Sequence, residues 1–122
     1  MFSFPAACDI KKKVSLWNSR GFSEVSFVQV SESYIEMLPK GVNKGSALIE
    51  LCAMQGIPID RTFFIGDSYN DKEIFLTAGF SACVAETPIE LQGYCDCVLG
   101  PCLDGALADF IQMLERENLR TA

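Results

Sequence analysis

The stretch "GDSYND" at 66–71 holds two carboxylates four residues apart, directly behind the apolar run at 62–65. If that run is a strand and a helix follows it, the oxygens of Asp67, Asn70 and Asp71 can converge above the strand. A hard cation such as Mg²⁺ prefers one or two carboxylates together with phosphate and water oxygens. The same residues also fit a helix start, with Asp67 as the N-cap and Asp71 near the positive end of the helix. The spacing supports these two interpretations evenly.

A second segment with chemical potential is "KGVNKGSAL" at 40–48, which places Lys44 at the expected start of a helix between the flexible residues Gly41 and Gly45. A lysine at such a position can point into the space above a sheet and neutralise a phosphate, aided by the helix N-terminus. The alternative is a solvated lysine without a ligand. The order Lys44-Gly45-Ser46 differs from the Gly-Lys-Ser/Thr order of the Walker P-loop, which excludes that site.

The composition narrows the classes of function. The 122 residues suffice for one domain, and 49% hydrophobic with 21% charged residues is typical of a globular protein. The net charge of −6 argues against a nucleic-acid surface, and no apolar run reaches the roughly 20 residues of a membrane span. The N-terminal "MFSFPAACDIKKK" has its apolar part before its basic part, the reverse of a secretory signal, so we expect a cytoplasmic protein.

Histidine and cysteine usage restricts the chemistry further. The chain has no histidine, which excludes Ser–His and Cys–His hydrolase mechanisms. Six cysteines are present, but no two of them form a CxxC pair. We therefore expect reduced, mostly buried thiols rather than a disulfide framework or a structural metal.

Hydrophobic periodicity predicts alternating helices and strands from residue 43 onward. Helices are expected at 43–56, 69–78, 87–94 and 103–119, and strands at 62–65, 80–85 and 95–100. This order favours an α/β fold with a parallel sheet flanked by helices. Gly79 is expected to close its helix as a C′ glycine, and Thr87 to cap the next helix with Pro88 at its first position.

The first 38 residues do not share this alternation. A short helix is expected at 9–20, followed by two strand-like runs at 24–30 and 33–38 that fit an antiparallel hairpin. We therefore predict a boundary near Pro39.

Taken together, "YIEMLPKGVNKGSAL" and "FFIGDSYNDKEIFLTAG" resemble, closely and in order, the C-terminal half of haloacid dehalogenase (HAD) superfamily phosphatases. The resemblance is strongest to the Cof-like branch (subfamily IIB), which has an inserted α/β cap, and it covers roughly residues 23–114. It implies a partial HAD-like Rossmannoid parallel sheet with flanking helices. Residues 1–38 would be the C-terminal remnant of the cap domain, a helix plus a hairpin, and 39–122 the C-terminal part of the core domain.

The resemblance also implies roles for four residues. Lys44 would stabilise the phosphoryl group, and Asn70 would contact the nucleophile or the phosphate. Asp67 would bind Mg²⁺ directly, while Asp71 would act on the metal through water or hold Lys44 in place. Lys44, Asn70 and Asp71 are thus the expected catalytic residues, Lys44 and Asn70 the phosphate-binding ones, and Asp67 and Asp71 the metal-binding ones. The expected substrate is a small phosphorylated metabolite, with sugar phosphates as the family expectation.

The sequence departs from the family pattern in one respect. HAD phosphatases attack phosphate with an aspartate of a DxD motif, and this chain contains no DxD. The only aspartate ahead of Lys44 is Asp9, where the second acidic position is Lys11. Without the nucleophile, the remaining groups can only position and neutralise a phosphate. Three hypotheses follow: a C-terminal part that is inactive alone, a non-catalytic phosphate- or metal-binding module, or one half of a split enzyme.

In the family sheet, the nucleophile strand lies beside the strand that here reads "TFFI". Its absence would leave the run at 62–65 with an open edge, which can pair with another chain. We therefore predict self-association through this edge, swapping of the N-terminal hairpin, or binding of a complementing N-terminal half.

Overall fold

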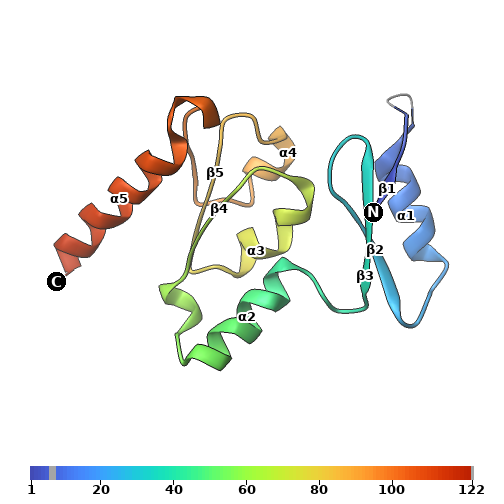
Figure 1. The fold of residues 1–122 in the computed structure, drawn as a ribbon, viewed down its shortest axis with the longest axis horizontal. Coiled ribbons are helices and arrows are strands. Elements are labelled where there is room, and N and C mark those ends of the chain that lie inside the picture. The colour runs from blue at the N-terminus through green and yellow to red at the C-terminus, as the bar shows by residue number, and fades with distance from the viewer. Residues whose placement is uncertain (6–7, 122) are drawn as a thin grey trace.

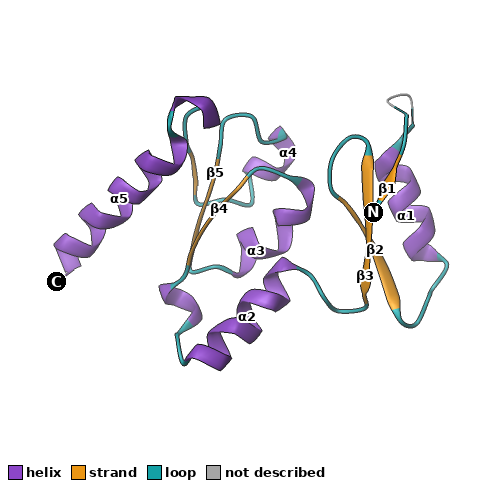
Figure 2. Ribbon diagram, viewed as in Figure 1, coloured by secondary structure: helices purple, strands orange, loops and turns teal. Residues whose placement is uncertain are grey.

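The structure of the protein is a computed structural model that describes residues 1–5 and 8–121, with side chains described up to residue 117. Figures 1 and 2 show two groups of elements, each built around its own sheet. The first group contains β1 (Phe2–Ser3), α1 (Ile10–Ser19), β2 (Val25–Gln29) and β3 (Tyr34–Pro39). The second group contains α2 (Lys44–Gln55), η1 (Ile59–Arg61), β4 (Phe63–Gly66), η2 (Tyr69–Asp71), α3 (Lys72–Thr77), β5 (Phe80–Cys83), α4 (Ile89–Gln92), β6 (Cys97–Val98), η3 (Cys102–Asp104) and α5 (Ala106–Thr121).

The N-terminal group is an antiparallel sheet in the order β1-β3-β2, with α1 packed against it. The predicted hairpin is confirmed, since Val28 lies opposite Glu36 in the β2–β3 register. Asp9 caps α1, because its Oδ1 accepts a hydrogen bond from the Lys12 amide at 3.0 Å. Trp17 of α1 fixes the helix on the sheet through aromatic contacts, including one with Phe27 of β2 at 5.1 Å between ring centroids.

The C-terminal group confirms the predicted α/β fold. Its three strands are parallel in the order β4-β5-β6, and Ile65 of β4 pairs with Ala82 of β5. β5 is the central strand, and its residues Ala82 and Cys83 are completely buried. β4 forms one edge of this sheet, as expected, because β5 is its only partner in the described part of the chain.

The division of the chain at 1–38 and 39–122 stays a prediction. The structure shows β3 continuing to Pro39 and α2 beginning at Lys44, so residues 40–43 connect the two groups. In Figure 1 this connection runs from the foot of β3 to the start of α2.

Gly79 follows the C-cap residue of α3, as predicted, but without the left-handed conformation usual at that position. Ala78 ends α3 in an extended conformation, and Gly79 is not among the residues with positive φ. A Cβ at Gly79 would lie 2.4 Å from the carbonyl oxygen of Asp60, so the position needs glycine for close backbone contact.

The assignment of Thr87 as an N-cap was wrong. Pro88 occupies the cap position of α4, and its extended backbone delays the helix start to Ile89. The Thr87 hydroxyl is instead buried without a hydrogen-bond partner in the described chain. Pro88 has a ψ of 136°, which is not helical, so the helix begins one residue later than predicted.

All six cysteines are free thiols. Only Cys52 and Cys83 are buried, so the expectation of mostly buried thiols was wrong. Burial raises the pKa of the Cys95 thiol to about 12, and the neighbouring Cys83 adds to the effect. Among the described residues, no helix is both long and apolar enough to cross a membrane.

Candidate functional site

Lys44 is placed by a well-defined helix start. Asn43 is the N-cap of α2, and its side-chain oxygen accepts a hydrogen bond from the Ser46 amide at 2.8 Å. The Ser46 hydroxyl in turn accepts one from the Asn43 amide at 2.9 Å. This reciprocal capping fixes where the helix begins, and therefore fixes Lys44 as its first residue.

Gly45 brings this helix start close to α3. A Cβ on Gly45 would lie 2.7 Å from the Thr77 hydroxyl and 2.8 Å from the Glu73 carbonyl oxygen. Gly45 is buried and lacks a positive φ, so the sequence interpretation of a flexible glycine missed its role. Its value is the absence of a side chain, which allows Lys44 to approach the turn before α3.

Asp71 is the central residue of the site, with only 2% of its surface exposed. Its Oδ1 accepts a hydrogen bond from the Lys44 ammonium at 2.5 Å. Its Oδ2 accepts hydrogen bonds from the amides of Asp67 at 3.0 Å and Ser68 at 3.1 Å. A buried carboxylate needs such partners, because an unpaired charge in the interior is strongly unfavourable. Asp71 thus holds Lys44 directly, which is one of the two roles that the resemblance implied.

Gly66 leaves the space that this carboxylate occupies. A Cβ at Gly66 would lie 2.6 Å from Asp71 Oδ2 and 2.7 Å from the Phe64 ring. The strand β4 can therefore turn into η2 with the Asp71 side chain folded back against its end. This close packing of Asp71 and Phe64 is the reason that glycine is needed at position 66.

A cavity of about 670 Å³ lies where the N-terminal sheet faces the start of α2 and the turn η2. Lys44 and Asn70 both line it. The Asn70 Oδ1 atom is buried and has no hydrogen-bond partner in the described chain. The Lys44 side chain is 48% exposed, so its ammonium can meet a ligand while Asp71 holds it from behind.

Asp67 lies apart from this cavity lining. Its residue is exposed, and its carboxylate has no hydrogen bond or ion pair among the described residues. The alternative role of Asp67 as an N-cap is not seen, because Ser68 precedes the η2 turn in that position. The structure therefore brings Lys44, Asn70 and Asp71 together and leaves the Asp67 carboxylate accessible beside them.

The donor atoms fit a hard cation on one side of the site. Asp67 offers an unpaired carboxylate, and the orphaned Asn70 oxygen is of the type that Mg²⁺ accepts. Asp71 is buried, and its Oδ1 already lies against the Lys44 ammonium, so it is poorly placed to bind a cation directly. No group of three or more Cys, Asp or Glu residues is arranged for a metal within the described residues. The remaining ligands of a cation would have to be water and phosphate oxygens.

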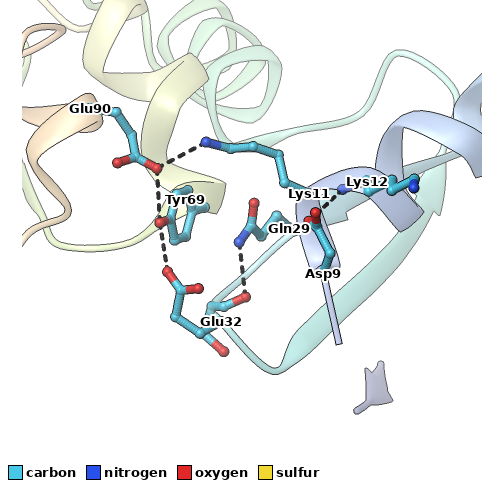
Figure 3. A network of polar contacts seen from close by, with 8 residues as sticks. Asp9, Lys11, Lys12, Gln29, Glu32, Tyr69 and Glu90 are labelled. Atoms are coloured by element: carbon cyan, nitrogen blue, oxygen red, sulfur yellow. Dashed lines mark hydrogen bonds and ion pairs between the residues drawn. The ribbon is translucent and has the colours of Figure 1, made fainter. Parts of the chain in front are cut away.

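A second polar cluster, drawn in Figure 3, joins the two sheets beside the cavity and centres on Tyr69. The Tyr69 hydroxyl lies 2.8 Å from Glu32 Oε1 in the β2–β3 turn and 3.0 Å from Glu90 Oε1 of α4. Lys11 of α1 donates to the same Glu90 oxygen at 3.1 Å. A hydroxyl has one proton, so Tyr69 donates to one carboxylate at a time.

The charges around Tyr69 have opposite effects on two groups. Burial raises the pKa of Tyr69, and the hydrogen bonds and charges of the two glutamates raise it further. The hydrogen bond from Lys11 lowers the pKa of Glu90, with a smaller contribution from Tyr69. The sequence gives no signal for this cluster, because no spacing rule links residues 11, 32, 69 and 90.

A family model described as haloacid dehalogenase-like hydrolase matches residues 4–111. The chain belongs to this family. The match includes every residue of the site described above and most of both sheets. Family membership therefore agrees with the resemblance carried by the segments around Lys44 and Asp67.

Two curated relatives are phosphatases with different names. An HMP-PP phosphatase of Serratia proteamaculans is 34% identical over 80 residues, which cover 64% of this chain and 29% of that protein. A phosphoglycolate phosphatase of Methanothermobacter thermautotrophicus is 41% identical over 64 residues, covering 52% of this chain and 29% of that protein. The chain thus spans less than a third of the length of these relatives.

Solved structures agree on the fold. The HAD subclass IIB sugar phosphatase BT4131 matches with a TM-score of 0.76 at 14% identity, covering 85% of this chain and 40% of that one. At this identity the likeness establishes the HAD-like Rossmannoid fold with its flanking helices. It does not extend to the substrate of that protein.

Proposed function

We propose that this chain provides the phosphate- and metal-binding part of a Mg²⁺-dependent HAD phosphatase that hydrolyses small phosphate monoesters. The observation that supports it most directly is the Lys44–Asp71 pair, which presents a held ammonium group to a cavity of about 670 Å³. Sugar phosphates are the substrates we favour, because the subclass IIB fold includes a protein named as a sugar phosphatase.

Each residue has a distinct role in this proposal. Lys44 neutralises the phosphoryl oxygens, and Asp71 keeps the ammonium in position through its short hydrogen bond. Asn70 contacts the phosphate from the cavity wall, while Asp67 holds the cation from its exposed position. Mg²⁺, when bound, would neutralise and orient the phosphoryl oxygens.

Turnover needs a nucleophile that these residues do not supply. The chain has no DxD sequence, the motif that carries the nucleophile in HAD phosphatases. We therefore expect binding without hydrolysis by the 122-residue chain. An assay of a generic aryl phosphate with Mg²⁺ tests this, and turnover by pure chain would contradict the requirement for the missing motif.

Binding of inorganic phosphate in the presence of Mg²⁺, followed by calorimetry, tests the site itself. Lys44→Met should weaken phosphate binding about 10- to 100-fold, the usual worth of a charge-assisted hydrogen bond. Asp67→Asn should weaken Mg²⁺ binding without unfolding the protein, because its carboxylate has no described partner.

Matched controls are available for both variants. Lys12 and Asp104 are exposed and do not line the cavity, so Lys12→Met and Asp104→Asn should leave binding unchanged. Equal losses in the site and control variants would contradict a specific site.

We also propose that the free edge of β4 receives a strand from the nucleophile-bearing portion that HAD phosphatases require. The argument rests on three observations. β5 is the only described partner of β4, Phe63 at this edge is 47% exposed, and the chain spans under a third of its relatives. Phe63 continues an aromatic row formed with Phe80 of β5 and Phe110 of α5. This row offers an apolar surface on which an incoming strand can pack.

Mixing the chain with a polypeptide that carries a DxD strand and the rest of a HAD core tests this proposal. Restored aryl-phosphate hydrolysis, lost again with Lys44→Met, is the expected result. Without that partner, light scattering should show self-association through the same edge, weakened by Phe63→Lys. A stable monomer at micromolar concentration, together with no gain of activity on mixing, would overturn the proposal.

A further inference from the structure

The charged side chains that line the 670 Å³ cavity differ in whether they have interaction partners. Four charged side chains line it: Glu36, Lys44, Lys72 and Glu73. Both cations already have partners, since Lys44 binds Asp71 and the Lys72 ammonium lies 5.0 Å from the centroid of the Tyr94 ring. Neither Glu36 nor Glu73 receives a hydrogen bond or ion pair through its carboxylate in the described part of the chain.

Glu36 is held toward the cavity by the alternation of β3. Ser26 and Val28 of β2 lie opposite Leu38 and Glu36, so these four residues share one face of the N-terminal sheet. All four line the cavity. Ile35, whose side chain points to the other face, is completely buried. Glu36 is only half-buried and lines the cavity, so its carboxylate is accessible to a ligand there.

Unpaired acceptors extend along the cavity wall. Besides Glu36, the Glu73 carboxylate is such an acceptor among the described residues. At the Lys44 end, the buried Asn70 Oδ1 has no partner among the described residues. The cavity wall thus holds two cations that already have partners, Lys44 and Lys72, and acceptors that have none in the described chain.

We propose that the cavity accepts phosphate monoesters whose organic part carries hydroxyl or ammonium donors, and that Glu36 selects against substrates with a second anionic group. This inference rests on the proposed function, because Lys44 must bind the phosphate end. The physical reason is complementarity: donors satisfy the free acceptors, whereas a carboxylate or second phosphate would meet the Glu36 charge. Glu36 is a specificity-determining residue in this proposal and takes no part in bond breaking.

Competitive binding to the 122-residue chain tests the inference. The probes are phosphoethanolamine, glucose 6-phosphate and phosphoglycolate, each compared with inorganic phosphate by calorimetry with Mg²⁺. We expect phosphoethanolamine and glucose 6-phosphate to bind more tightly than phosphoglycolate. Glu36→Gln should reduce the preference over phosphoglycolate about five-fold, the size expected for one charge acting across a solvent-accessible cavity. Glu36→Lys should reverse the preference.

A control and two contrary outcomes complete the test. Glu24 is exposed just before β2 and does not line the cavity, so Glu24→Gln should leave all ratios unchanged. If the variants bind phosphate and the ratios do not move, the role of Glu36 is overturned while the proposed function stands. If inorganic phosphate does not bind, or binds equally to Lys44→Met, the proposed function fails and this inference falls with it.

Discussion

Two sets of polar contacts lie at the candidate site, and we call them the Lys44–Asp71 junction and the Tyr69 junction. They differ in burial and in how many of their polar atoms have hydrogen-bond partners. At the Lys44–Asp71 junction, the Asp71 side chain is 3% exposed and both of its oxygens accept hydrogen bonds. At the Tyr69 junction, one hydroxyl faces two carboxylates, and the side chains of Lys11 and Glu90 are 70% and 47% exposed.

This difference separates a fixed contact from an adjustable one. The Lys44–Asp71 pair lies within one α/β unit, where loss of Lys44 would leave the buried Asp71 carboxylate without its cation. The Tyr69 cluster links the two sheets through groups that water can replace. We infer that the first junction defines the geometry of the site, whereas the second sets how firmly the N-terminal sheet rests over the cavity.

The largest effect is expected for Asp71→Ala. The change removes the hydrogen-bond acceptor of two backbone amides and of the Lys44 ammonium. It should lower the free energy of unfolding by about 3 kcal/mol. Urea denaturation measures the loss, and phosphate binding should disappear as well. Asp104→Ala, an exposed control, should change stability by less than about 0.5 kcal/mol. A similar small loss for Asp71→Ala would remove the distinction between the two junctions.

A smaller loss is expected for Gly66→Ala. The new Cβ would collide with Asp71 Oδ2 and the Phe64 ring, which should cost about 2 kcal/mol and displace the carboxylate from Lys44. Gly100→Ala is the matched control, because nothing lies within 4 Å of a Cβ at that position. If both variants unfold at the same urea concentration, the close packing of Asp71 against the end of β4 does not constrain the site.

Tyr69→Phe should have a weaker effect, confined to the joint between the two sheets. It removes one hydroxyl at a partly exposed site, so the expected loss is about 0.5–1 kcal/mol. Proteolysis of the connecting residues 40–43 should accelerate, while phosphate affinity should change little. A loss of phosphate affinity equal to that of Asp71→Ala would show that the two junctions act as one.

The smallest effect concerns acid titration of Glu90. Lys11 holds the pKa of Glu90 below its usual value of 4.5, so the charged form favours the folded state. The resulting stabilisation is present above pH 4.5 and is lost as the pH falls through the lowered pKa. NMR titration of Glu90 should show its pKa rising toward the usual value in Lys11→Met. An unchanged pKa in that variant would mean that Lys11 does not hold Glu90 in solution.

The sequence predicted the fixed junction better than the adjustable one. Lys44 and Asp71 lie within two segments with strong local signals, a helix start and a strand-to-helix turn, and the family resemblance connects them. Tyr69 carries no such signal, since its partners are 37 and 21 residues away and sit on separate elements. Its contact depends on how the two sheets face each other, which local periodicity does not encode.

Most of the other differences between the sequence predictions and the structure lie at glycine and proline residues. Gly79 and Gly45 were interpreted by their backbone freedom, although the structure uses both for close approach to neighbouring backbone or side-chain atoms. Such contacts are tertiary, so the residue type gives no indication of which reason applies. At Pro88, two local rules competed, and the proline took the cap position that Thr87 was expected to fill.

The sequence separations of these contacts bear on the order in which they form. Lys44 and Asp71 are 27 residues apart, whereas Lys11 and Glu90 are 79 apart. Shorter loops close at a lower entropic cost, so the Lys44–Asp71 contact can form before the N-terminal sheet docks. A φ-value above about 0.5 for a conservative change at Asp71, with a value near zero at Glu90, is the expected kinetic signature. In folding terms, the anion-binding end would be an early, local nucleus, and the sheet that covers it a late addition.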